Sequence, residues 1–201
     1  MSALAQPYFT PEEYIDMERR AEFKSEYDCG QIFAMAGASR AHNLVSGNVF
    51  GALQRKLAES PCEVYSSDMR VQAASASRYS YPDVAVVCGK PEFLDAKEDT
   101  LLNPLVLVEV LSPSTESKDR GEKFLRYRRI EALSDYLLVS QDAHRVEHFQ
   151  RQADGSWRLT EAEGLGGSVT LDALGCVLPL AEVYAKVTLE QVVRLVLEGP
   201  R

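Results

Sequence analysis

Two short apolar runs, each with a single carboxylate at one end, constrain the fold of this chain more than any other feature. Asp83 precedes the run Val84–Val87, and Glu109 follows the run Leu105–Val108. Short runs rich in valine and leucine favour buried β-strands. Because an unpaired buried charge is costly, such acids are normally paired, protonated or bound to a metal. Two acids on adjacent strands therefore suggest a site for a hard divalent cation.

The composition fits a globular protein. The 201 residues are 45% hydrophobic, and we expect a single domain over residues 1–201 with a short C-terminal helical tail. No apolar run approaches the ~20 residues that a membrane span needs, and residues 1–7 lack the pattern of a secretory signal. Four scattered cysteines without CxxC spacing argue against zinc and against a disulfide framework, so we expect reduced thiols in a cytoplasmic protein.

The charge of the chain is acidic overall, with one basic stretch. The net charge of −8 counts against nonspecific nucleic-acid affinity, because that affinity depends on Lys and Arg neutralising phosphates. The most basic stretch contains Arg120, Lys123, Arg126, Arg128 and Arg129. It is either a solvated helix face or a local basic surface, and the sequence leaves both interpretations open.

The order of predicted elements favours an α/β (α+β) fold in which helices flank a mixed β-sheet. Thr10 and Ser39 are good N-caps for the first two helices, and Ser114 or Thr115 caps a third. The predicted helices begin at residues 11 and 40 and cover residues 116–130 and 188–197. The predicted strands lie within residues 23–35, 62–73, 79–88, 104–111, 136–139, 145–149 and 157–159.

Several of these segments resemble a known family. Pro82-Asp83, followed by Glu109 within an apolar strand, resembles the PD-(D/E)xK pattern of the restriction-endonuclease-like superfamily. The chain also resembles the bacterial Uma family, whose members are classed as restriction endonucleases. The segments that carry this second resemblance are residues 26–35, 39–43, 81–84, 104–115 and 119–127. The resemblance implies a restriction-endonuclease-like core and a DNA endonuclease.

The resemblance also implies roles for individual acids. Asp83 is expected to be the first metal-binding acid, and Glu109 the acid of the (D/E)xK half-motif. Glu26 is expected as a further acid that reaches the metal directly or through water. Together these catalytic acids would hold Mg²⁺ or Mn²⁺ for hydrolysis of a DNA phosphodiester. Since cutting both strands takes two sites, we expect a homodimer. We expect DNA to be its binding partner, and we expect no membrane partner.

The position of the catalytic lysine departs from the superfamily motif. Leu111 stands two residues after Glu109, where the motif has Lys. The family pattern moves this role onto the following helix, which points to Lys123, with a solvent-facing Lys118 as the weaker candidate. If no lysine reaches the acids, the alternative is a decayed nuclease fold that binds nucleic acid or another partner without catalysis.

Each candidate also has a structural interpretation that the sequence leaves open. Asp83 fits a turn at a strand entrance, Glu109 fits an ion pair with an arginine, and Glu26 fits an exposed hairpin position. Lys123 fits a solvated helix face. His42 and Arg120 are further candidates for a phosphate contact or for a contact with the metal-binding residues; for His42 a surface or capping role is the alternative.

Overall fold

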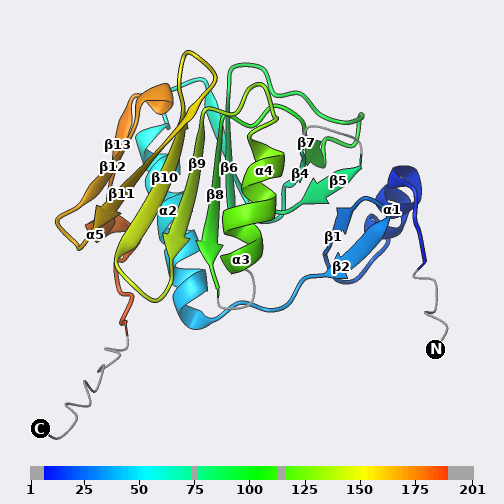
Figure 1. Cartoon of the computed structure of the whole chain (residues 1–201), viewed down its shortest axis with the longest axis horizontal. Coiled ribbons are helices and arrows are strands. Elements are labelled where there is room, and N and C mark those ends of the chain that lie inside the picture. The colour runs from blue at the N-terminus through cyan, green and yellow to red at the C-terminus, as the bar shows by residue number, and fades with distance from the viewer. Residues whose placement is uncertain (1–6, 74–76, 113–115, 190–201) are drawn as a thin grey trace, which may run out of the picture.

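The computed structural model describes residues 7–73, 77–112 and 116–189, and its centre is a six-stranded mixed sheet (Figure 1). The strand order is β11-β10-β9-β8-β6-β3. Only β8 and β9 run parallel; the other neighbouring pairs in this sheet are antiparallel. The six strands are β3 (Cys62–Ser66), β6 (Val84–Cys88), β8 (Val106–Leu111), β9 (Asp135–Ser140), β10 (Arg145–Arg151) and β11 (Trp157–Glu163). The two strands with the predicted acids therefore lie inside the sheet, as expected.

The two faces of the central sheet are covered by different helices (Figure 1). Side chains alternate along each strand, so Val84, Val86 and Val108 pack toward helix α2 (Arg40–Lys56), which lies behind the sheet in this view. Ala85 and Leu107 face the opposite side, where a shorter helical segment lies. Because apolar residues occupy both sets of positions, these strands read as continuous apolar runs in the sequence.

The helical segment on the second face is not a regular α-helix, because it contains a π-helical turn. It consists of α3 (Glu116–Lys118), the π-helical turn η1 (Asp119–Lys123) and α4 (Phe124–Tyr127). The predicted continuous helix over residues 116–130 is confirmed over residues 116–127 except for this π-helical turn, and residues 128–130 are not helical. Ser114 and Thr115, its predicted caps, lie outside the described residues. π-helical turns are rare in proteins, and many of those that occur lie at functional sites.

A second sheet lies beside the first and carries the N-terminal part of the chain. Its order is β2-β1-β5-β4-β7, and helix α1 (Pro11–Glu18) packs on it through Tyr14 and Ile15. The strands are β1 (Ser25–Asp28), β2 (Gln31–Ala34), β4 (Arg70–Gln72), β5 (Arg78–Ser80) and β7 (Thr100–Leu101). The hairpin predicted over residues 23–35 is confirmed, and its turn residues Cys29 and Gly30 both have positive φ.

The C-terminal elements complete the core on the α2 side of the central sheet. Strands β12 (Ser168–Leu171) and β13 (Cys176–Pro179) form a hairpin around the short 3₁₀ helix η2 (Asp172–Leu174), and α5 (Leu180–Val183) follows. Leu171, Leu178 and Leu180 join the cluster that includes α2. Residues 188 and 189 are not helical, and the rest of the predicted helical tail, residues 190–197, lies outside the described residues.

One prediction about the cysteines was wrong. Cys62 and Cys88 form a disulfide bond, whereas Cys29 and Cys176 have free thiols. The reason is the antiparallel register of β3 and β6, which places Cys62 directly opposite Cys88. Residues 26 positions apart gave no spacing signal in the sequence. The cytoplasmic location that rested partly on reduced thiols stays a prediction.

Among the residues that the structure describes, no helix is long and apolar enough to cross a membrane.

Candidate active site

Asp83 and Glu109 lie across from each other on neighbouring strands. The register of β6 and β8 pairs Val84 with Val108, so the next residues outward, Asp83 and Glu109, face the same side of the sheet. That side is the one covered by α3, η1 and α4. The Val110 amide donates a hydrogen bond to Asp83 Oδ2 at 2.7 Å. Asp83 is therefore tied to the neighbouring strand rather than exposed in a turn.

Lys123 reaches these acids from the helical segment above them. Its Nζ lies 3.0 Å from Glu109 Oε1 and 3.1 Å from Glu26 Oε1, and it also lies 3.2 Å from Asp119 Oδ1. The lysine is 7% exposed, so it does not belong to a solvated helix face. We call Glu26, Glu109, Asp119 and Lys123, with Asp83 beside Glu109, the acid–lysine cluster.

Two hydroxyl groups that the sequence did not single out complete the surroundings of Glu109. Tyr127 donates a hydrogen bond to Glu109 Oε1 at 3.0 Å, and Ser80 Oγ lies 2.7 Å from the same tyrosine oxygen. Asp119 was also missed. The spacing of Asp119, Lys123 and Tyr127 at intervals of four residues was the available signal, since residues so spaced lie on one helix face.

Burial and crowded carboxylates shift the pKa values of the cluster. Burial is the main cause that raises the pKa of Glu109 well above its usual value; the Lys123 charge opposes it, and the nearby carboxylates of Asp119, Asp83 and Glu26 add to it. Burial alone would lower the pKa of Lys123, but the surrounding carboxylates outweigh burial and raise it. Lys123 thus stays a cation, and Glu109 holds its proton to higher pH than an exposed glutamate.

Glu26 is not an exposed hairpin residue. Burial alone would raise the pKa of the Glu26 carboxyl, yet the two lysines beside it lower the pKa overall. Lys118 Nζ lies 2.8 Å from Glu26 Oε2 and also 4.9 Å from the centre of the Phe33 ring. Lys118 therefore contacts the cluster through Glu26, instead of facing solvent as the sequence suggested.

Of the two further candidates, His42 lies beside the acid–lysine cluster and Arg120 does not form an ion pair with it within the described part of the chain. His42, in the first turn of α2, places Nε2 3.4 Å from Asp83 Oδ2, on the edge of the cluster. Burial alone would lower the pKa of His42, but the bond to Asp83 and its charge raise it overall. Arg120 pairs with Glu116 at 2.8 Å and with Glu147. None of its ion pairs among the described residues involves the acid–lysine cluster.

The donor atoms available for a cation are mainly those of Asp83 and Glu109. Carboxylate oxygens on adjacent strands suit Mg²⁺ chemically. Glu26 instead binds two lysine ammonium groups. Within residues 7–73, 77–112 and 116–189, no three or more His, Cys, Asp or Glu side chains form a group that could hold a metal ion. Metal binding by Asp83, Glu109 and Glu26 therefore stays a prediction, with the first two as the better fit.

Comparison with known proteins identifies the family. Residues 11–181 match the family model Uma2, described as "Putative restriction endonuclease". The chain belongs to the Uma2 family. Uma2 is a nuclease family by that description, and the match extends beyond the segment from about Tyr14 to Arg151 on which the sequence resemblance rested.

Two relatives come from Synechocystis sp. (strain ATCC 27184 / PCC 6803 / Kazusa). "Uncharacterized protein sll1609" is 40% identical over 155 residues, which cover 77% of this Uma2 chain and 88% of the relative. "Uncharacterized protein slr1290" is 36% identical over 177 residues, which cover 84% and 92% of the two chains. The similarity therefore spans most of all three proteins.

A solved structure shares the fold. It is described as "a putative nuclease belonging to DUF820" from Anabaena variabilis ATCC 29413, and it superposes with a TM-score of 0.74. The match covers 90% of this chain and 99% of that chain at 14% sequence identity. At this identity the comparison concerns the fold alone, and it supports the predicted restriction-endonuclease-like core.

Proposed function

We propose that this Uma2 protein is a DNA endonuclease that uses Mg²⁺ or Mn²⁺ and a PD-(D/E)xK-type site. The observation that carries the proposal is the position of Lys123, whose ammonium lies 3.0 Å from Glu109 although it comes from a separate helical segment. The motif lysine is replaced by Leu111 in β8, and Lys123 supplies an ammonium at the same carboxylate. This contact also argues against the decayed-nuclease alternative, which required the lysine to point away.

Each residue of the site has a distinct role in this proposal. Asp83 and Glu109 hold the cation, which supplies Lewis acidity at the scissile phosphate. Lys123 stabilises the negative charge that develops on the phosphate as water attacks. Glu26 fixes the position of the Lys123 ammonium through an ion pair at 3.1 Å. Tyr127 holds the Glu109 carboxyl in place through its hydroxyl group.

The second proposal concerns assembly. One acid–lysine cluster per chain cuts one strand, so a nuclease that breaks both strands would work as a homodimer. Light scattering coupled to size exclusion gives the mass in solution. A mass of one chain, 22.3 kDa, under conditions that support double-strand cleavage would exclude this assembly.

The test of the proposed activity is cleavage of supercoiled plasmid in Mg²⁺ or Mn²⁺. Asp83→Asn and Glu109→Gln are the matched variants, because each keeps the shape of the side chain and removes its charge. We expect both variants to cut at least about 100-fold more slowly than the wild type in the same metal ion. We expect a similar loss for the wild type when EDTA removes the metal. Asp68→Asn is the control, since its side chain is 85% exposed and pairs only with Lys24 among the described residues. Equal rates in all four proteins would refute the proposal.

A further inference from the structure

The basic stretch that follows Lys123 divides into paired and unpaired arginines. Arg120 pairs with Glu116 and Glu147, and Arg126 pairs with Asp28 and Glu122. Arg128 and Arg129 are exposed, and neither has an ion-pair partner within the part of the chain that the structure describes. The net charge of the chain is −8, so two neighbouring arginines without an acidic partner among the described residues form a local patch of opposite, positive charge. Exposed cations of this kind attract an anionic ligand.

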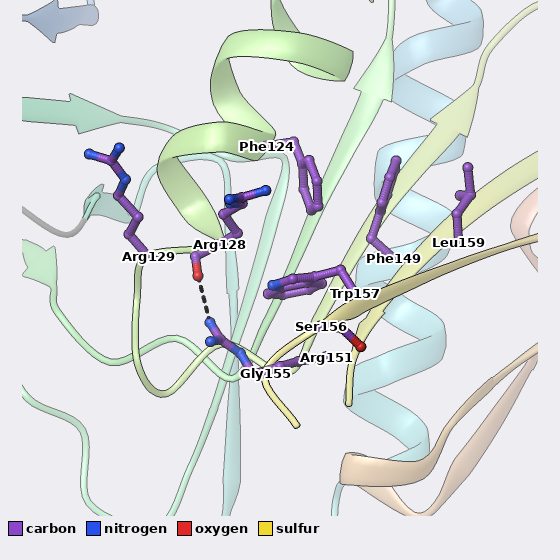
Figure 2. Close-up of a pocket in the computed structure, with 9 residues that line it drawn as sticks. All are labelled: Phe124, Arg128, Arg129, Phe149, Arg151, Gly155, Ser156, Trp157 and Leu159. Atoms are coloured by element: carbon purple, nitrogen blue, oxygen red, sulfur yellow. Dashed lines mark hydrogen bonds between the residues drawn. The ribbon is translucent and has the colours of Figure 1, made fainter. Parts of the chain in front are cut away.

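These two arginines border a groove with an aromatic floor (Figure 2). The groove has a volume of about 530 Å³ and lies between the end of α4 and strands β10 and β11. Its lining residues are Phe124, Arg128, Arg129, Phe149, Arg151 and Trp157, with Gly155, Ser156 and Leu159. The groove is therefore basic on one side and aromatic on the other.

The aromatic floor is held rigidly in place. Phe124 packs against Phe149 with ring centroids 4.3 Å apart, and it meets Trp157 edge-on at 5.5 Å. Arg151 lies over the Trp157 ring at 4.8 Å, and its guanidinium also donates hydrogen bonds to the backbone carbonyls of Arg128 and Ile130. Arg151 thus fixes both the tryptophan and the end of the helix. Trp157 remains partly exposed toward the groove.

The groove lies next to the acid–lysine cluster on the same face of the central sheet. Phe124 directly follows Lys123 in the chain, and Lys123 faces Glu109 while Phe124 faces β9 and β10. Arg128 follows Lys123 by five residues, which corresponds to roughly 7–8 Å along a helix axis. Along this helical segment, the groove therefore begins within two turns of the lysine that contacts Glu109.

We propose that this groove binds an unpaired stretch of the DNA strand next to the cleavage site. A base packs on Trp157, and the backbone phosphates pair with Arg128 and Arg129. Aromatic rings beside a positively charged track are the usual means of binding single strands, because every base offers a flat face. In a duplex the bases are stacked inside, so the aromatic floor would stay unused. The identity of the ligand rests on the proposed nuclease function, whereas the charge and shape of the groove do not.

The test measures binding without cleavage. Trp157 is the sole tryptophan of the chain, so its fluorescence reports on the groove directly. The probe is oligothymidylate of about 12 nucleotides in EDTA, a length within the site sizes of ~4–16 nucleotides typical of single-strand binding folds. We expect quenching of Trp157 fluorescence on binding and a weaker interaction with a duplex of the same length. Duplex binding of equal affinity, or binding without quenching, would overturn the proposal.

Variants separate charge from stacking. With a fluorescein-labelled probe, the double variant Arg128→Ala, Arg129→Ala should bind at least about tenfold more weakly. The slope of log affinity against log salt should fall by about 1.4, because each lost phosphate contact to a single strand contributes about 0.7. Trp157→Leu should weaken binding roughly tenfold with an unchanged salt slope, while Trp157→Phe, which keeps a ring, should weaken it less. Arg158→Ala is the matched control, since alternation along β11 turns Arg158 to the other face of the sheet. An equal loss of affinity in the control would overturn the proposal.

The outcomes distinguish this inference from the proposed activity. If plasmid cleavage depends on Asp83 and Glu109 but the arginine double variant binds and cuts as the wild type does, the groove proposal fails and the nuclease proposal stands. If oligothymidylate binds with quenching but no divalent cation supports cleavage, the groove proposal stands and the nuclease proposal fails.

Discussion

The acid–lysine cluster and a second cluster of buried polar side chains around Arg70 differ in how their charges balance. In the acid–lysine cluster, one lysine lies within 3.2 Å of three carboxylates. In the second cluster, Arg70 Nη2 lies 3.0 Å from Asp99, and its other nitrogens donate to Tyr81 at 3.0 Å and Thr100 at 2.9 Å. The Arg70 cluster lies close in sequence to the site, because Tyr81 is two residues before Asp83.

We interpret this difference as one between a cluster that stabilises the fold and the proposed active site. Around Arg70, the hydrogen bonds suit the charged forms: Arg19 and Arg70 lower the pKa of Asp99 to about 2. Around Lys123, burial and excess carboxylates raise the pKa of Glu109 instead. A cluster that stabilises the fold satisfies its charges, whereas a site that binds a cation or a phosphate keeps unsatisfied charge for the ligand. Three predictions test this distinction by stability.

The largest expected effect is the loss of Arg70. This residue is 2% exposed, and Arg70→Leu leaves Asp99 without that partner and removes donors to Tyr81 and Thr100. We expect a loss of about 3 kcal/mol in the free energy of unfolding, at the low end for a broken buried pair since Asp99 stays partly exposed. Urea denaturation measures it. A loss below about 0.5 kcal/mol would show that the Arg70 cluster does not stabilise the fold.

The next effect contrasts two buried glutamates. Glu18 accepts hydrogen bonds from the Ser25 amide at 2.9 Å, the Ser25 hydroxyl at 2.5 Å and the Tyr81 hydroxyl at 2.9 Å. Glu18→Gln replaces an acceptor by a donor and should cost about 1–3 kcal/mol.

Glu109→Gln should behave differently in the same denaturation experiment. Burial and the neighbouring carboxylates raise the pKa of Glu109, so its charged form is already disfavoured in the folded protein, and we expect removal of that charge to change the free energy of unfolding by less than about 1 kcal/mol. If both variants lose stability equally, the proposed contrast between the clusters is wrong.

The smallest effect concerns acid pH. The folded-state pKa of Asp99 is depressed from 3.8 to about 2, chiefly by the hydrogen bond from Arg19. Its stabilising contribution is therefore complete above pH ~4 and is lost as the pH falls toward about 2. Asp99→Asn should flatten the pH dependence of unfolding in that window and leave it unchanged near neutrality. An unchanged slope between pH 4 and 2 would contradict this assignment.

The sequence was sufficient for parts of the fold and of the site that depend on local pattern. The apolar runs beside Asp83 and Glu109 predicted adjacent buried strands because both faces of those strands are covered. Thr10 was recognisable as an N-cap because its side chain accepts from the Glu13 amide within the same turn. The lysine position came from the family resemblance, and the helix itself placed Lys123 over the acids.

Features that depend on tertiary register could not be predicted. The disulfide follows from the pairing of Cys62 with Cys88 across two strands. The pairing of Arg126 with Asp28 joins residues 98 positions apart, so the basic stretch could not be divided into paired and unpaired arginines. Asp119 and Tyr127 each lie four residues from Lys123, which places them on its helix face, but only the tertiary structure places that face over Glu109.

The most direct test of the central claim compares two lysines in single-turnover plasmid cleavage. Lys123→Met removes the ammonium beside Glu109, and Lys118→Met removes the neighbouring one that contacts Glu26. We predict a loss of at least about 100-fold for Lys123→Met and a change within about threefold for Lys118→Met, with both variants folded by circular dichroism. Cleavage by Lys123→Met at the wild-type rate would contradict the account.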